Sequence, residues 1–112
     1  MAATKKIKVR KVERSQAIHF WNKASEFYQG ITLAADRDNW NLVGLNAVHC
    51  AISAADAVLV HEAGVRSVSG DHRDTVDLLK ERVEREGVSA AAKHLETLLT
   101  MKSDIEYSER EL

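Results

Sequence analysis

Residues 40–63, WNLVGLNAVHCAISAADAVLVHEA, decide the fold, because they are apolar around most of a helical circumference. A helix of this kind usually lies at the centre of a domain, covered by its neighbours. Gly64 follows the segment and suits the left-handed conformation of the residue beyond a helix end. We therefore predict a central helix over about 40–63. Its most regular apolar side consists of residues three or four apart: Val43, Ala47, Ala51, Ala54 and Val58.

Three weaker helical patterns accompany the central segment: they cover about 15–35, about 71–86 and the chain from residue 89 onward. Residues 65–70 are predicted to be a loop. Because the connections between them are short, neighbouring helices should be antiparallel. The sequence thus predicts an all-α, up-down bundle of four to five helices, with an end or bend of the last one near Ser103. The expected core stripes are Ile18, Trp21, Ala24, Tyr28, Ile31 and Ala35; then Val76, Leu79 and Val83; then Ala92, Leu95, Leu98, Leu99 and Ile105.

Size and charge distribution indicate one domain preceded by a basic segment. A chain of 112 residues suits a single core. Residues 1–14 contain six basic side chains and one acidic side chain, a net charge of +5, whereas the remainder carries −6. Such a segment can contact phosphates or anionic lipid, or be a solvated, frayed terminus. We predict a flexible basic arm over 1–14 and a helical-bundle domain over 15–112.

Several classes of protein are disfavoured by what the sequence lacks. The basic arm has no apolar run typical of a secretion signal, and we expect no apolar stretch of the ~20 residues that a membrane span needs. A single cysteine, Cys50, excludes an internal disulfide, and no pair of histidines has the four-residue helical step of a zinc protease. We expect a cytoplasmic protein without membrane contact, metal or cofactor.

One polar stripe interrupts the apolar central helix. Asn46, His49, Ser53 and Asp56 follow one another at steps of three or four residues and fall within about 60° on a helix. Leaving such groups buried and unpaired would cost about 1–3 kcal/mol each. Two interpretations remain: a polar groove that holds a ligand and is completed by His72, or a structural hydrogen-bond network within the bundle or across a subunit interface.

Arg66 and His72 are the candidate catalytic pair. An arginine can hold a phosphate, and a histidine can move a proton near neutral pH. Together they could cleave RNA without metal, with His72 handling the proton of the ribose hydroxyl and Arg66 stabilising the charged phosphorane. The alternative is that His72 is structural, at the start of a helix. Asp71 would hold its ring and repel an incoming phosphate, which favours a site without nuclease activity.

The order of these residues resembles the HEPN superfamily, small helical domains named for nucleotide binding in higher eukaryotes and prokaryotes. The similarity covers about residues 15–110 and is carried by NAVHCAISAADAV at 46–58, GVRS at 64–67, GDHR at 70–73 and the Lys102 to Glu106-Tyr107 segment. It resembles a branch with the pattern H-x-A-I-x-A-x-D-A in the second helix. The resemblance implies a four- or five-helix bundle that commonly forms dimers.

The resemblance also implies two kinds of function. Many HEPN proteins are metal-independent ribonucleases, often toxins paired with a nucleotidyltransferase-like antitoxin, that use an arginine and a histidine four to six residues apart. Arg66 and His72 have this spacing, but they lie between the second and third helices rather than in a later helix. We therefore favour a non-catalytic homodimer that binds a nucleotide, RNA or a partner protein through the polar stripe and His72. The alternatives are a ribonuclease, or a structural bundle such as an antitoxin or immunity partner.

Overall fold

The predicted all-α bundle is confirmed, with the addition of a small two-stranded sheet. The structure, a computed structural model, describes residues 6–107 and, among them, the side chains of residues 6–101. The central helix has the predicted bounds. In chain order the elements are β1 (Val9–Lys11), the short 3-10 helix η1 (Arg14–Gln16), α1 (Ala17–Asp36), α2 (Trp40–Ala63), β2 (Val65–Ser67), α3 (Arg73–Arg82) and α4 (Val88–Tyr107).

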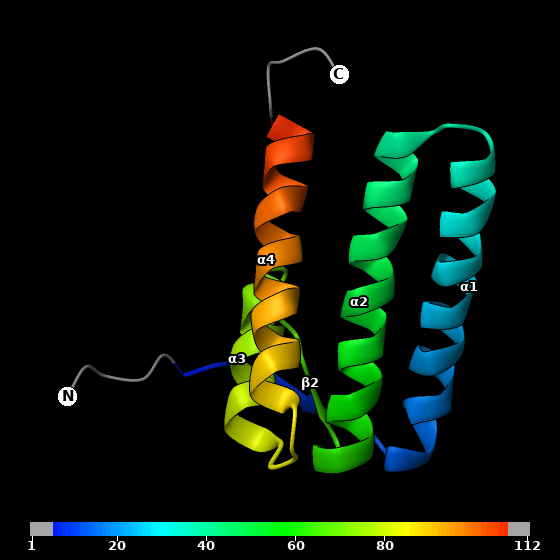
Figure 1. The fold of residues 1–112 in the computed structure, drawn as a ribbon. Coiled ribbons are helices and arrows are strands. Elements are labelled where there is room, and N and C mark those ends of the chain that lie inside the picture. Colours follow the sequence, from blue (N-terminus) through cyan, green and yellow to red (C-terminus); the bar gives the residue numbers. More distant parts are fainter. Residues whose placement is uncertain (1–5, 108–112) are drawn as a thin grey trace.

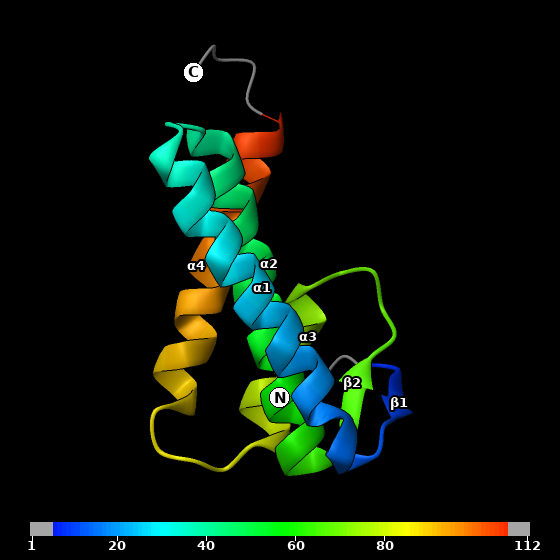
Figure 2. The same cartoon turned by 90° about the vertical axis from the view of Figure 1, so that its right-hand side faces the viewer.

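Helix α2 lies at the centre of the domain and contacts all three other α-helices. Figure 1 shows α1 and α4 on either side of α2, with α3 behind the lower part of α4. Among the described residues no contact joins α1 to α4. Figure 2 shows the two short strands beside the beginning of α1. The helices therefore form an open layer, α1–α2–α4, in which only α3 and the strands close one side.

The core forms where α2, α3 and α4 meet. As predicted, Val76, Leu79 and Val83 of the third stripe are buried, and so are Ala92 and Leu95 of the fourth. Ile105 lies outside the described side chains. The larger fully buried side chains come from α2 and α3, which confirms the central place of α2. They are Leu59, Leu78, Val48, Val60 and Val76.

Two helix ends differ from the sequence-based expectation. Helix α3 ends at Arg82, four residues earlier than expected, because Val83 turns to an extended backbone while its side chain stays buried. Helix α4 continues past Ser103 to Tyr107, so the polar Lys102-Ser103-Asp104 step does not end it. Gly64 adopts the predicted left-handed conformation with φ of 65°, and its backbone N–H caps the end of α2 by donating a hydrogen bond to Val60 O.

The apolar stripe predicted for α1 is only partly the buried one. Ile18, Trp21 and Tyr28 are more than half exposed, whereas Ala24 and Ala34 are buried against α2. The buried face passes through Ala24, Phe27, Ile31 and Ala34 instead. Helix α1 has apolar residues on two faces, and periodicity alone does not say which of them meets α2.

The segment predicted as a loop after α2 begins with a strand. β2 pairs antiparallel with β1, and the register places Arg10 opposite Arg66. The pairing extends at both ends through hydrogen bonds from Val12 N to Gly64 O and from Val68 N to Lys8 O. Residues 1–5 of the predicted flexible arm lie outside the described residues. From residue 8 onward the segment is part of the domain, held by backbone hydrogen bonds to the residues that follow α2.

The expectation that no apolar stretch is long enough to cross a membrane is corrected by α2. This helix has 24 residues and a mean hydropathy of 1.6 in its most apolar window, which meets the length and composition of a span. The core helix of a soluble protein passes the same test, and α2 has α1, α3 and α4 packed around it. These neighbours bury 44% of the window, so the central position accounts for part of its apolarity.

Candidate functional site

The polar stripe of α2 lies along the contact with α1. His49 stacks on Phe27, with 5.3 Å between ring centroids and 26° between the rings. Asn46 faces Gly30 so closely that a Cβ on this glycine would lie 2.8 Å from Asn46 Nδ2. Ser53 is buried as well. These three side chains therefore fill the interface between two helices rather than line an open groove.

Asp56, the last member of the stripe, has a different environment from the first three. It lies about 15 Å along the helix axis from Asn46, near the end where β2 approaches. Its carboxylate is buried, with the residue 6% exposed. Arg66 of β2 places Nη2 at 3.5 Å from Asp56 Oδ2. The structure thus joins one residue of the polar stripe to one residue of the predicted catalytic pair.

Two features of the fold, Val65 and Phe20, hold Arg66 in this position. Val65, its neighbour on β2, is buried and anchors the strand. The guanidinium carbon lies 4.9 Å from the ring centroid of Phe20 on α1, within cation–π range. Arg66 Nε is buried and has no hydrogen-bond partner among the described residues. The side chain of Arg66 remains 37% exposed, so part of the guanidinium is still open to solvent.

The charges around Asp56 define a cluster of four residues, which we call the Asp56 cluster. Burial raises the pKa of Asp56 above its ordinary value of 3.8, and the positive charges of Arg66, His72 and Lys23 partly oppose this shift. The three basic residues come from β2, the loop before α3 and α1. Residues far apart in the sequence therefore act electrostatically on one carboxylate, and no motif or periodicity pointed to Lys23 as a member.

Asp71 makes two backbone hydrogen bonds at the start of α3. Its Oδ1 accepts a hydrogen bond from the backbone N–H of Arg73 at 3.0 Å, and its own N–H donates to Ser69 Oγ at 2.9 Å. The carboxylate therefore stabilises the first turn of α3. The carboxylate of Asp56 on α2 also interacts electrostatically with His72.

The burial of Asp56 predicts a pH dependence of stability. Because the folded-state pKa is raised, the contribution of Asp56 to stability is fully present below its unfolded value and is lost as pH rises through the folded value. Asp56→Asn keeps the shape but has no proton to lose. The free energy of unfolding of the natural protein minus that of the variant should therefore decrease as pH rises above the ordinary pKa of Asp56, 3.8. Urea unfolding at several pH values measures this difference, and a difference that rises with pH would contradict the prediction.

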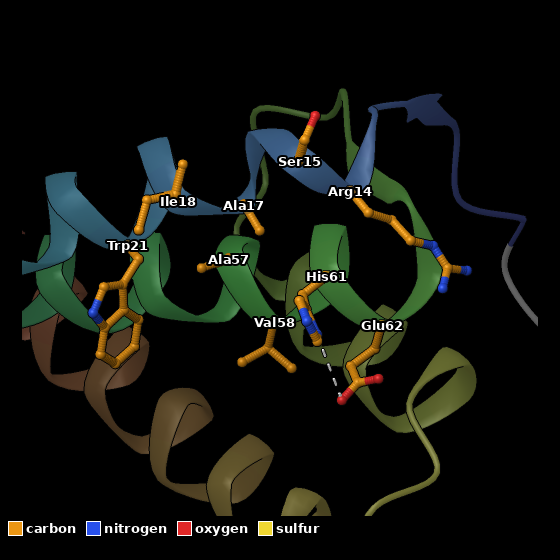
Figure 3. A pocket seen from close by; sticks show the side chains of 9 residues that line it. All are labelled: Arg14, Ser15, Ala17, Ile18, Trp21, Ala57, Val58, His61 and Glu62. Carbon is orange, nitrogen blue, oxygen red and sulfur yellow. Dashed lines mark ion pairs between the residues drawn. The ribbon is translucent and has the colours of Figure 1, made fainter.

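A second feature is an apolar groove across α2. A hollow of about 410 Å³ lies between α1 and α2, and one of about 620 Å³ lies between α2 and α4; both include Val58 and Glu62 in their walls. In Figure 3, Trp21 of α1 and Val58 of α2 point to the same side of the helix pair. Six apolar side chains from the walls of these two hollows are together called the apolar groove: Ile18, Trp21, Ala54, Val58, Ala91 and Leu98.

Charged residues border this groove at one end. Glu62 forms ion pairs with Arg85 and with His61, and the groove is otherwise apolar between α1 and α4. Two features of the sequence indicate this groove. One is the second apolar stripe of α1, and the other is an α2 helix with more apolar surface than its neighbours can cover. Trp21 is 56% exposed and Val58 is 36% exposed. An exposed apolar surface of this kind commonly marks an interaction site.

Metal binding and thiol chemistry place definite requirements on the described residues. No three His, Cys, Asp or Glu side chains there come together in a way that could hold a metal ion. Burial raises the pKa of the Cys50 thiol, which is the opposite of what activates a nucleophilic cysteine. No protein-family model, curated protein or solved structure matches this chain. The Asp56 cluster and the apolar groove are thus the two candidate sites.

Proposed function

We propose that this protein is a HEPN-like, non-catalytic module that forms a homodimer and binds the phosphate of a nucleotide or RNA at the Asp56 cluster. The observation that supports it is the ion pair between Arg66 and the buried carboxylate of Asp56, on which the charges of His72 and Lys23 also act. Arg66 and Lys23 alone bring two positive charges against the single negative charge of Asp56. The surplus positive charge suits an anionic ligand.

The arrangement of Arg66 favours binding a phosphate at the surface of this cluster. Asp56 lies beneath and takes one guanidinium nitrogen, while the partly exposed remainder of the guanidinium keeps N–H donors for a ligand. Phe20 supports the same group from α1. An arginine held in this way loses little side-chain entropy when a phosphate arrives, because its position is already restricted.

The same arrangement disfavours cleavage. Cleavage of RNA adds negative charge to the phosphate in the transition state, and an enzyme must stabilise that charge more strongly than the ground state. Asp56 opposes this requirement because it shares Arg66 and adds a negative charge nearby. The alternative, a metal-independent ribonuclease with Arg66 and His72 as catalytic residues, is favoured by one observation: both residues interact with the same carboxylate.

The apolar groove supports the dimer. It consists of apolar side chains from three helices, of which Ile18, Trp21 and Val58 are exposed, while Ala54 and Leu98 are partly buried. A second copy of the chain can cover the groove with the same surface, as in two-fold dimers. A stable pair would bury about 1,200 Å² or more in total. In this proposal a nucleotidyltransferase-like protein or another partner would bind the assembled dimer.

Binding of AMP and of a labelled single-stranded RNA tests the proposed site. Arg66→Gln is expected to weaken both at least about tenfold, the order of one charge-assisted hydrogen bond. Arg73→Gln, at the exposed start of α3, removes the same charge and should change both far less. Fluorescence anisotropy and calorimetry measure the affinities, and circular dichroism checks folding.

Because Arg66→Gln also leaves Asp56 without its arginine, Lys23→Gln serves as a second variant that keeps the Asp56–Arg66 pair intact. It should weaken AMP binding without a change in stability. We expect the natural protein to leave the RNA intact without metal. Cleavage that is lost in both Arg66→Ala and His72→Ala, with folding preserved, would replace this proposal by the ribonuclease alternative.

A further inference from the structure

The basic segment before α1 belongs to the surface that carries Arg66. In the antiparallel pair of β1 and β2, Arg10 lies directly opposite Arg66. Residues directly opposite in such a pair have their side chains on the same face of the sheet, with Cβ atoms about 4.5–5.5 Å apart. Arg10 is therefore the cross-strand neighbour of the arginine in the Asp56 cluster.

The two faces of the small sheet differ in chemistry. Ile7 and Val9 pack against the hydrophobic core. Because side chains alternate along a strand, Lys8 and Arg10 lie on the other face, with the face that carries Arg66. The pairing reaches Lys8, whose carbonyl accepts a hydrogen bond from Val68 N. Ile7 and Val9 thus hold the strand in place, while Lys8 and Arg10 lie on the face that carries Arg66.

These cations have no partners within the part of the chain that the structure describes. The residues in question are Lys6, Lys8, Arg10, Lys11 and Arg14; all are exposed, and none forms an ion pair there. By contrast Arg85, Arg82 and Lys80 each pair with a glutamate. Like charges directly opposite on two strands are unfavourable for a sheet. The position of Arg10 opposite Arg66 therefore destabilises the strand pair through repulsion of like charges, and an anionic ligand would reduce this repulsion.

We propose that β1 extends the Asp56 cluster into a track for the backbone of single-stranded RNA, in which Arg66 holds one phosphate and Arg10 and Lys8 hold those that follow. This inference rests on the proposed function and deepens it. It makes the ligand a chain of phosphates rather than a mononucleotide.

The geometry favours an extended nucleic-acid strand over a membrane surface. Lys8 and Arg10 are two residues apart and thus repeat at about 6.7 Å along an extended strand. Arg66 lies across the sheet from Arg10, so the three cations form a short path that begins at a partly buried arginine, whereas lipid headgroups attract a broad exposed patch. The aromatic ring of Phe20, which lies against Arg66, adds a π-face at the beginning of the path. An aromatic side chain beside basic groups is a common arrangement in proteins that bind single strands.

The test compares Lys8→Gln/Arg10→Gln with the charge-matched control Arg37→Gln/Lys93→Gln. Arg37 follows the far end of α1, about 30 Å along that helix from β1, and Lys93 lies on α4. The affinity for a labelled 12-nucleotide RNA is measured at several salt concentrations. Loss of two phosphate contacts should reduce the slope of log K against log salt by about 1.4, since each contact to a single strand contributes about 0.7. The control should leave the slope unchanged.

A second ligand separates this inference from the proposed function. AMP carries one phosphate group, so its affinity should depend on Arg66 and stay within about twofold in the Lys8→Gln/Arg10→Gln variant. If RNA binding depends on Arg66 but its salt slope is the same in the double variant, the track is overturned while the proposed function stands. If Arg66→Gln changes neither ligand, the proposed function itself fails. Binding of anionic phosphatidylserine vesicles that depends on Lys8 and Arg10, with RNA binding unaffected, would assign the basic path to a membrane surface and overturn the inference.

Discussion

Val58→Asp should convert the protein from a dimer to a monomer at micromolar concentration. Val58 belongs to both hollows of the apolar groove and lies between Trp21 of α1 and the side chains of α4. In the proposed dimer it would be covered by the second copy. A carboxylate buried there without a partner would cost about 3–5 kcal/mol, enough to weaken the dimer by at least about a hundredfold.

Sedimentation velocity at tens of micromolar measures this effect. The natural chain should sediment at twice its mass of 12.5 kDa, and the variant at 12.5 kDa. Leu33→Asp is the matched control, because Leu33 is 66% exposed on α1 and does not line the groove. Val58 is already 36% exposed in the single chain, so the folded monomer should tolerate the charge. A natural protein that sediments as a monomer would remove the dimer from the proposed function.

Leu59→Ala should produce the largest loss of stability among single truncations. Leu59 is completely buried in the cluster that joins α2, α3 and α4. Truncation of a leucine in such a site costs about 2–5 kcal/mol, because burial is lost and a cavity remains. The total stability of a domain is only about 5–15 kcal/mol, so the variant should be close to unfolding at moderate temperature.

Urea unfolding followed by circular dichroism measures the loss, at one protein concentration because dimer formation adds to apparent stability. The same substitution at the exposed Leu33 provides the control and should cost about 0.5 kcal/mol or less. Equal losses at the two positions would mean that α2 is not the centre of the core. Leu59 and Val58 are adjacent in sequence, so the two experiments also separate the buried side of α2 from its open side.

The helical elements were predictable because their signals are local. The 3.6-residue repeat of apolar side chains, the glycine at the end of α2 and the absence of proline act within a few turns of chain. Residues 40–63 therefore specified a central helix, and it has the expected bounds. The stripes of α3 and α4 were also found, since each of these helices has one apolar face.

The choice between two apolar faces was not predictable for α1. Ile18, Trp21 and Tyr28 repeat as regularly as Ala24, Phe27 and Ile31, and both sets satisfy a helical period. The close approach of Gly30 to Asn46 and the stacking of Phe27 on His49 select the second set. These contacts depend on where α2 lies, which a pattern within α1 does not contain.

The sequence by itself determined the helices, the central place of α2 and the residue types available for a site. Only the tertiary structure decided which of them meet. Asp56 and Arg66 come together because β2 turns back along α2, and β1 joins them because its backbone pairs with β2. Lys23 belongs to α1 and His72 to the loop before α3, and both act on the same carboxylate. Helix periodicity is a property of neighbouring residues. The convergence of charges on one buried carboxylate depends instead on long-range packing and on the pairing of β1 with β2. Strands of only three residues have almost no recognisable sequence pattern.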